Sequence, residues 1–312
     1  MKKISIITPC LNESKEGLVE CCEKITKLFS EELKDYDYEH IICDNNSEKE
    51  TIDTLREISL KNKKIKVIIN AKNYGSAKSV FNGIKNSSGD AVILFFPVDM
   101  QDPPEKIPEL VRKWEEGFDF VVGCRDQREE FFLMKMIRKF FYIILKKFSK
   151  NSIPLNVSDF QLVDRKIIDK FLELKDNLPF LRTLAFEYSD NFATINYTWK
   201  KRIYGKSKES LKDYINSAMN GLVSVSDAPF RLIIIAGFIL SAFSLTYGVY
   251  AFIYNLIFQT NLVKGLPTIL ISVLIFSGLQ LLVLGFIGEY VTSLHNKIKK
   301  DIEVNEKEKI NF

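Results

Sequence analysis

This chain of 312 residues has no cysteines at the spacings typical of disulfide frameworks or metal sites. The five cysteines are odd in number and none shows CxxC spacing; they are Cys10, Cys21, Cys22, Cys43 and Cys124. This usage argues against a disulfide framework and against a zinc site. We therefore expect buried, reduced thiols in a cytosolic setting.

A strong charge bias and the common nucleotide-binding glycine motifs are also lacking. The formal net charge is +4, which is too mild for a dedicated nucleic-acid binder, although clustered charges leave a membrane surface open. Neither GxGxxG nor GxxxxGK[ST] occurs, so a dinucleotide oxidoreductase and a P-loop NTPase are poorly supported. The opening MKKISIITPC is too short and too quickly polar for a signal peptide.

The stretch 91–104, reading AVILFFPVDMQDPP, combines an apolar run with acidic and amide residues. The run predicts a strand buried on both faces, and polar residues just beyond such a strand lie where open α/β sheets bind ligands. Asp99 and Gln101 are two residues apart, so in an extended tip both point the same way. Their oxygen atoms suit a hard cation such as Mg²⁺ or Mn²⁺. A surface turn after a core strand is the alternative interpretation.

Strands and helices alternate over the first two thirds of the chain. We expect strands at 3–8, 38–43, 65–70, 91–96, 118–124 and 191–197, and helices at 17–33, 50–61, 76–86, 104–116, 163–188 and 210–224. Ser14 is the expected N-cap of the first helix, Gly83 is expected to interrupt the third, and Pro179 to start a new helix. The alternation predicts a mostly parallel, doubly wound α/β sheet.

Polar residues follow four of the expected strands. They are Glu13, Asp44, Asn73 and Asp99. Because the carboxyl ends of parallel strands meet at one edge of a sheet, we expect these residues to converge there and to form a site.

Two long uncharged runs occupy the C-terminal third, at 232–257 and 265–288. Each is long enough to span a bilayer and longer than an ordinary buried helix. Lysines reappear at 297, 299 and 300, so both ends are expected to face the cytosol and the segment around Lys264 to face outward. The predicted layout is a cytosolic domain at 1–210, a juxtamembrane helix at 211–229, a transmembrane hairpin at 230–290 and a charged cytosolic tail at 291–312. The protein is thus expected in the cell membrane with two spans.

Two basic segments each allow two interpretations. Residues 131–150, FFLMKMIRKFFYIILKKFSK, suit an amphipathic helix at the lipid headgroups or a core helix with a solvated lysine face. Residues 200–208, KKRIYGKSK, suit a solvated loop or a flexible loop that wraps phosphate oxygens.

Seven short motifs occur in a fixed order ahead of the uncharged runs. They are TPCLNE, DNNS, KNYG, VDMQDPPE, GCR, DFQLVDR and RIYGKSK, and Gly-Glu-Tyr follows at 288–290. As a set they resemble the polyprenyl-phosphate glycosyltransferases of glycosyltransferase family 2, over nearly the whole chain to about Asn296. That family includes dolichyl-phosphate mannose synthase and the bacterial two-span enzymes that charge undecaprenyl phosphate with glucose or aminoarabinose.

The resemblance implies a Rossmann-like GT-A fold and an inverting glycosyltransferase. The donor would be a nucleotide-diphosphate sugar, with a UDP-sugar as the first candidate. The acceptor would be a polyprenyl phosphate, with undecaprenyl phosphate as the first candidate, and the product would serve cell-envelope glycan assembly or modification. Mg²⁺ or Mn²⁺ is the implied cofactor, nucleic acid is not an implied partner, and self-association through the spans follows by analogy. The lipid phosphate is already anionic, so no general base is required, and neither His40 nor His295 is expected to take part in catalysis.

The resemblance also implies residue roles. Nucleotide contacts fall on Pro9, Glu13, Asp44, Asn73, Gly75 and Asp99, with Glu13 near the ribose and Asp44 on the base. Asp99 and Gln101 would be the cation ligands. The implied catalytic residues are Asp99, Arg125, Arg202 and Lys208. The acceptor phosphate would be held by Arg125, Arg202, Ser207 and Lys208. The three cationic side chains of this group would also hold the departing diphosphate.

Three positions depart from the family pattern. Pro97 stands where the family commonly has the first acid of Asp-x-Asp, Gln161 where arginine is common, and Lys206 where an acid is frequent. Asp102 is an alternative acid, although its position before Pro103 points elsewhere as easily. The departures leave a second hypothesis open, a non-catalytic membrane scaffold that binds nucleotide sugar.

Overall fold

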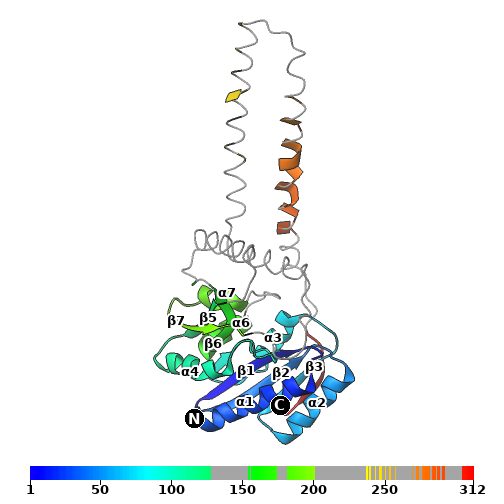
Figure 1. Cartoon of the computed structure of the whole chain (residues 1–312), viewed down its shortest axis with the longest axis vertical. Coiled ribbons are helices and arrows are strands. Elements are labelled where there is room, and N and C mark those ends of the chain that lie inside the picture. Colours follow the sequence, from blue (N-terminus) through cyan, green and yellow to red (C-terminus); the bar gives the residue numbers. More distant parts are fainter. Residues whose placement is uncertain are drawn as a thin grey trace.

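The computed structural model describes residues 1–127, 154, 156–173, 181–200 and 304–312, together with scattered positions between 237 and 291. Its central feature is an eight-stranded sheet in the order β7-β5-β6-β4-β1-β2-β3-β8 (Figure 1). The strands are β1 (Lys3–Cys10), β2 (Asp37–Asp44), β3 (Ile65–Asn70), β4 (Ala91–Ile93), β5 (Phe120–Gln127), β6 (Val157–Asp164), β7 (Phe192–Thr198) and β8 (Glu306–Ile310). The helices are α1 (Lys15–Glu31), α2 (Lys49–Lys61), α3 (Ser76–Lys85), η1 (Pro104–Lys106), α4 (Ile107–Glu115), α6 (Arg165–Glu173), α7 (Leu181–Leu184) and η2 (Ala185–Glu187).

The sheet is mixed but mostly parallel, which confirms the α/β, GT-A-like part of the expected fold class; the transmembrane hairpin stays a prediction. β1, β2, β3, β4, β5 and β7 run in one direction, and β6 and β8 run against them. The carboxyl ends of the parallel strands therefore share one edge, where open sheets bind ligands.

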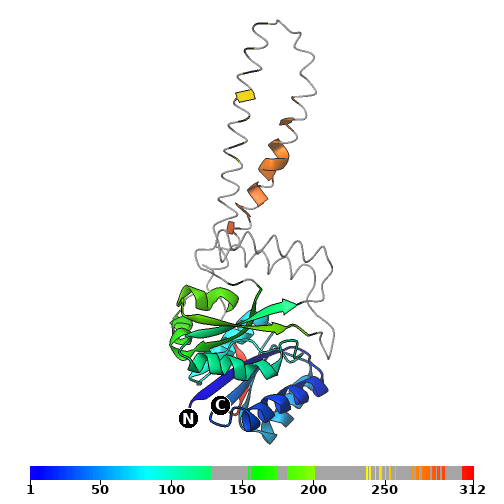
Figure 2. The same cartoon turned by 60° about the vertical axis from the view of Figure 1, so that its left-hand side comes forward.

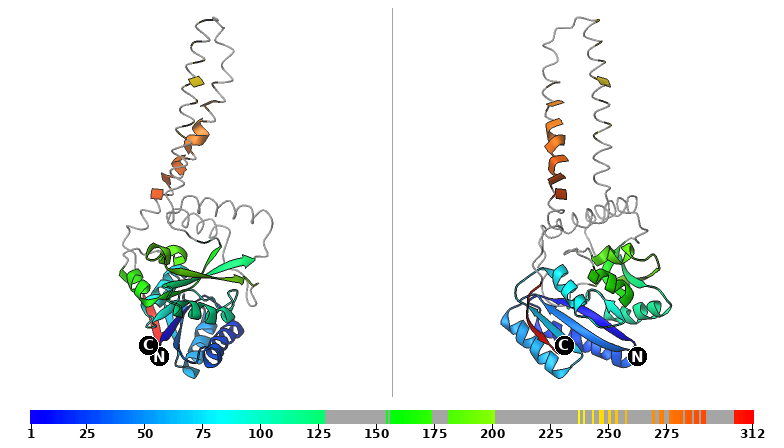
Figure 3. Two further views of the ribbon diagram at one scale, coloured as in Figure 1. Left: turned by 90° about the vertical axis from the view of Figure 1, so that its left-hand side faces the viewer. Right: turned by 180° about the vertical axis from the view of Figure 1, so that it is seen from behind.

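Helices cover both faces of the sheet (Figures 2 and 3). Because side chains alternate along a strand, β1 sends Ile4 and Ile6 to one hydrophobic cluster and Ile7 to the other. The first cluster takes apolar side chains from α1, α2 and α4, and the second from α3, α6 and α7. Both clusters are fully buried at their centres, which gives the site a rigid base.

Several local predictions hold, and two change. The Ser14 side chain caps α1 by accepting a hydrogen bond from the backbone N–H of Gly17 (3.2 Å), as expected. Gly83 does not interrupt α3, so that prediction is wrong. A Cβ at Gly83 would lie 2.4 Å from Cys43 Sγ, so the glycine allows the helix to pack closely on β2.

The strand predicted at 91–96 is shorter than expected. β4 ends at Ile93, but the chain beyond it stays bonded on both sides: the N–H of Leu94 donates to the carbonyl of Gln161 (3.0 Å) and that of Phe96 to the carbonyl of Ile7 (2.9 Å). The segment is therefore held between β6 and β1 up to Pro97.

Two strands were not expected. The helix predicted over 163–188 is wrong at its start, because β6 continues to Asp164 and lies antiparallel between β4 and β5. β8 lies in the segment predicted as a charged tail and pairs antiparallel with β3. In both cases the pairing partners lie far away in sequence, and local patterns do not report such pairings.

The predicted membrane segments fall mostly outside the described residues. This applies to 131–150, to 211–229 and to most of 230–290, and Pro179 lies outside them too. Within the part of the chain that the structure describes, no helix is both long and apolar enough to cross a bilayer.

Candidate functional site at the carboxyl edge of the sheet

The loops after β1 and β2 are tied together. Cys10 and Asp44, the last residues of the two strands, are register partners. The N–H of Asn12 donates to Ser47 Oγ (2.7 Å), and Asn12 Oδ1 accepts from the N–H of Glu48 (2.7 Å). Pro9, Glu13 and Asp44 are thus brought to one edge, as the sequence predicts for Glu13 and Asp44.

Asp44 presents an unused acceptor at this edge. Its side chain is buried, and Oδ2 accepts from the N–H of Ser47 (3.0 Å). Oδ1 is also buried and has no hydrogen-bond partner among the described residues. Burial raises the pKa of this carboxyl above its usual value. A buried carboxylate oxygen without a partner is costly, so the arrangement fits a ligand N–H that donates to it.

Asn45 is a residue that the sequence analysis missed. Its amide nitrogen donates to Asn73 Oδ1 (2.7 Å), and its amide oxygen accepts from the N–H of Tyr74 (2.9 Å). Asn73 Oδ1 also accepts from the N–H of Gly75 (2.9 Å). Gly75 has a φ of +87°, a backbone conformation that favours glycine. Asn45 therefore locks the loop of Asn73 and Gly75 to the end of β2. It lies in the DNNS motif, but nothing local distinguishes it from its neighbours there.

Asp99 and Gln101 lie in a tight turn, so the expectation of an extended tip is wrong. Met100 has a φ of +50°, its N–H donates to the carbonyl of Pro97 (3.2 Å), and the N–H of Gln101 donates to Asp99 Oδ1 (3.1 Å). The Gln101 amide nitrogen donates to the carbonyl of Lys200 (3.2 Å), which directs its nitrogen away from any cation. One carboxylate and one amide oxygen are a donor set that suits a hard divalent cation. Among the described residues no group of three or more His, Cys, Asp or Glu could hold a metal ion.

Asp102 is held by two neighbouring side chains. It is buried, and it forms an ion pair with Arg125 (Nη2 to Oδ1, 3.1 Å) and accepts a hydrogen bond from the hydroxyl of Tyr197. Burial raises the pKa of the Asp102 carboxyl, an effect that the charge of Arg125 opposes. The Arg125 guanidinium also donates to Tyr197 (3.0 Å) and lies over the Trp199 ring. Asp102 therefore holds Arg125 in place, and the phosphate role of Arg125 stays a prediction.

A second acid, Asp159, lies at the same edge because β6 runs antiparallel and begins there. It pairs with Arg182 (Nε to Oδ1, 3.2 Å), and its charge acts on both Asp102 and Arg125. Gln161, on the same strand, is buried and donates to the carbonyls of Ser158 (2.8 Å) and Arg182 (2.7 Å). Gln161 thus joins β6 to α7.

The remaining predicted residues divide into two groups. Arg202, Ser207, Lys208 and His295 lie outside the described residues, so their roles stay predictions. His40 is buried in β2 and its Nε2 is hydrogen-bonded to Thr8 Oγ1 (2.8 Å), which supports the structural role expected of it.

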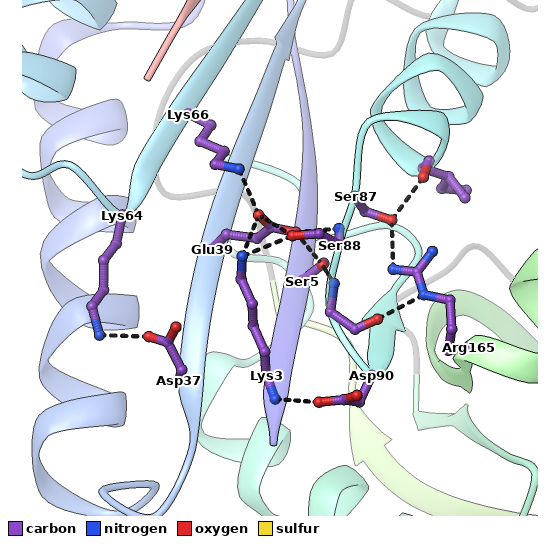
Figure 4. A network of polar contacts seen from close by, with 12 residues as sticks. Lys3, Ser5, Asp37, Glu39, Lys64, Lys66, Ser87, Ser88, Asp90 and Arg165 are labelled. Atoms are coloured by element: carbon purple, nitrogen blue, oxygen red, sulfur yellow. Dashed lines mark hydrogen bonds and ion pairs between the residues drawn. The ribbon is translucent and has the colours of Figure 1, made fainter. Parts of the chain in front are cut away.

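A polar network at the opposite end of the strands is not a second site (Figure 4). Glu39, which is 1% exposed, binds Lys3 (2.9 Å) and Lys66 (2.8 Å) and accepts from Ser5 Oγ (2.6 Å) and the N–H of Ser88 (2.6 Å). Its carboxylate is satisfied by these contacts, so the network ties β1, β2 and β3 together.

The chain is similar to known glycosyltransferases. The family described as Glycosyl transferase family 2 matches residues 5–172. The chain is 31% identical to the bactoprenol glucosyl transferase of Shigella phage SfV, covering 98% of this chain and 100% of that protein. It is also 31% identical to an uncharacterized glycosyltransferase, YkcC, of Bacillus subtilis, covering 95% and 90%. Among solved structures, glucosyl-3-phosphoglycerate synthase from Mycobacterium tuberculosis aligns with a TM-score of 0.49 at 15% identity, covering 72% of this chain and 77% of that one.

Proposed function

The chain belongs to glycosyl transferase family 2, and on that premise we propose that it transfers a hexose from a UDP-sugar to undecaprenyl phosphate with inversion at the anomeric carbon. Glucose is the first candidate sugar. The observation that carries the proposal is the full-length similarity to proteins named bactoprenol glucosyl transferase. The polar residues gathered at the carboxyl edge of the sheet support it.

The donor nucleotide would bind at the loops after β1, β2 and β3. Asp44 Oδ1 is a buried acceptor, and the imide N–H of uracil is a donor of the right kind. Glu13 would lie near the ribose, and the Asn73 to Gly75 loop would line the nucleotide from β3. Asn45 contributes by holding that loop in one conformation.

Asp99 and Gln101 would hold the divalent cation through one oxygen each. When bound, the cation supplies positive charge that neutralises the donor diphosphate and stabilises it as the leaving group. Pro97 contributes no ligand, but its carbonyl accepts from the N–H of Met100 and so helps form the turn that presents Asp99. In this proposal the turn takes over part of the positioning that a second acid provides elsewhere in the family.

The acceptor phosphate would be held by Arg202, Ser207 and Lys208. An oxygen of the lipid phosphate attacks the anomeric carbon, the bond from that carbon to the diphosphate breaks, and UDP leaves with the bonding electron pair. No proton has to be removed from the nucleophile, so catalysis rests on positioning and electrostatics. Gln101 exchanges hydrogen bonds with Lys200, at the start of this basic segment, and would thereby link the cation side of the site to the acceptor side.

The cell membrane is the proposed location, with two spans in 230–290 and both termini in the cytosol. Large apolar side chains at helical positions support this, because they are exposed to an extent that is unfavourable in water. Phe243 is 71% exposed, Leu281 is 70% and Ile269 is 65%.

A UDP-release assay tests the function. The full-length protein in nanodiscs is given undecaprenyl phosphate, Mg²⁺ or Mn²⁺, and a panel of nucleotide sugars led by UDP-glucose. We expect UDP release that requires both lipid and cation. Asp99→Ala should reduce turnover at least about 100-fold, the scale of a lost charge-stabilising group, and abolish cation-dependent UDP binding. Asp37→Ala, which removes an exposed pair far from the site, is the matched control.

The outcomes separate the two functions considered. UDP binding without turnover for every donor would contradict the enzyme and favour the non-catalytic scaffold. Wild-type turnover in Asp99→Ala would contradict the ligand assignment.

A further inference from the structure

The C-terminal strand β8 closes the edge of the sheet beside β3. It pairs antiparallel with β3 from Val67 to Asn70. The N-terminus and the C-terminus of the chain lie at the same end of the sheet (Figures 1 and 3). An antiparallel strand at this edge begins where the parallel strands end. The first residues of β8 are therefore brought to the proposed donor site.

A bulge in β8 lets it bind both helix layers. Ile69 pairs with Glu308 but Asn70 pairs with Glu306, so Lys307 is the extra residue. Side chains two residues apart on a regular strand point to the same face of the sheet. Because the extra residue shifts this alternation by one, the side chains of Glu308 and Glu306 point to opposite faces. Glu308 binds Arg56 of α2 (2.6 Å), and Glu306 accepts from Asn82 of α3 (2.9 Å).

The residue before β8 contacts the donor loop directly. The carbonyl of Asn305 accepts from the N–H of Ala71 (2.8 Å), and the N–H of Asn305 donates to the hydroxyl oxygen of Tyr74 (3.1 Å). Both partners flank Asn73 in the loop that Asn45 holds from the other side. The loop is thus fixed between the end of β2 and the C-terminal segment.

The far end of β8 is also anchored. The Asn311 amide nitrogen donates to the carbonyls of Ser59 (2.7 Å) and Ile65 (2.8 Å), and Ile310 packs against the hydrophobic core. The segment 304–312 is therefore fixed at both ends, as an integral strand of the domain.

We propose that the C-terminal segment 304–312 is a positioning element of the donor site, which holds the loop of Asn73 and Gly75 in its nucleotide-binding conformation. This inference rests on the proposed function, because that function assigns the loop to the donor. The segment does not touch the reacting atoms. Its contribution is preorganisation, so its loss should weaken donor binding more than it slows the chemical step.

The test compares the intact chain with a shortened chain that ends at Glu303. We expect the Kd for UDP and the KM for the donor to rise about tenfold, with kcat at saturating donor within about twofold of wild type. Adding the peptide VNEKEKINF, residues 304–312, should restore donor affinity. Rescue in trans separates positioning from general damage, because a misfolded domain would not recover its affinity.

Two point variants keep the proposal testable if the shortened chain fails to fold. Tyr74→Phe removes the acceptor for the N–H of Asn305 and should raise the donor KM about threefold, a larger effect than its effect on kcat. As the control, Glu57→Gln breaks an exposed ion pair with Lys15, outside the segment 304–312 and away from the loop, and should leave the donor KM unchanged.

An unchanged Kd for UDP in the shortened chain would overturn the proposal, as would equal losses in kcat and affinity that the peptide does not rescue. Failure of the proposed function is distinguishable. In that case the intact protein shows no turnover, while the UDP-binding comparison between intact and shortened chains still decides the role of β8.

Discussion

At the residue scale, Asp44 combines deep burial with an oxygen that no described residue satisfies. If this oxygen accepts from the base of the donor, Asp44→Asn should raise the Kd for UDP about 10- to 100-fold, the effect of losing one hydrogen bond to a charged group. Isothermal titration with UDP measures it. Asp53→Asn, an exposed change on α2, is the control. An unchanged Kd in Asp44→Asn would exclude Asp44 from base binding.

His40 makes a prediction about pH at the same scale. Burial lowers its pKa from 6.5 to about 4, so the unfolded chain binds the proton before the folded chain does. Stability should therefore be constant above about pH 7 and fall as the pH drops from 6.5 towards 4, by roughly 2 kcal/mol at pH 5.

The thermal midpoint of unfolding at pH 7 and pH 5 measures this loss. His40→Gln should show a smaller drop than wild type. Thr8→Val removes the hydrogen bond but keeps His40 buried, and should retain the wild-type pH dependence. Equal drops in wild type and His40→Gln would show that other groups cause the acid sensitivity.

At the scale of elements, the Glu39 network joins three parallel strands at their amino ends (Figure 4). Although burial opposes it, hydrogen bonds from Lys66, Ser5, Ser88 and Lys3 lower the pKa of Glu39 to about 2. The stability that it contributes is complete above its usual pKa of 4.5 and is lost as the pH falls towards 2, a lower window than that of His40.

Glu39→Gln at pH 7 should lower the free energy of unfolding by about 2–3 kcal/mol, because it leaves Lys3 and Lys66 without their shared carboxylate. Asp37 lies on the same strand as Glu39 and forms an exposed ion pair with Lys64. Asp37→Asn breaks this pair and should cost less than about 1 kcal/mol. Denaturant titrations of both variants provide the comparison. Equal losses would mean that burial of Glu39 does not strengthen its ion pairs.

At the scale of the whole molecule, the proposed hairpin predicts which side of the membrane each segment faces. The five natural cysteines are all buried, so introduced cysteines can be labelled selectively. A membrane-impermeant maleimide should label Gln259→Cys in intact cells, because the segment between the uncharged runs is expected outside. It should label Lys307→Cys, on the exposed side of β8, only after permeabilisation. Labelling of both in intact cells would refute the orientation.

How far the sequence predicts this protein depends on how local each feature is. The bounds of β3, the N-cap at Ser14 and the parallel alternation follow from neighbouring residues, and the structure confirms them. The convergence of Glu13 and Asp44 also follows, since it depends on strand direction alone. The turn at Asp99 does not follow, because the left-handed conformation of Met100 leaves no mark in the local pattern.

The sequence by itself determined the family, the order of the motifs and the α/β class. The tertiary structure decided which polar residues work together. It paired Asp102 with Arg125 and set Asn45 and Asn305 on either side of one loop. It also turned a charged C-terminal segment into a strand of the sheet. Each of these depends on a partner far away in the chain, and a partner's position is fixed only when the sheet forms, because strand pairing and buried hydrogen bonds are set by the whole fold.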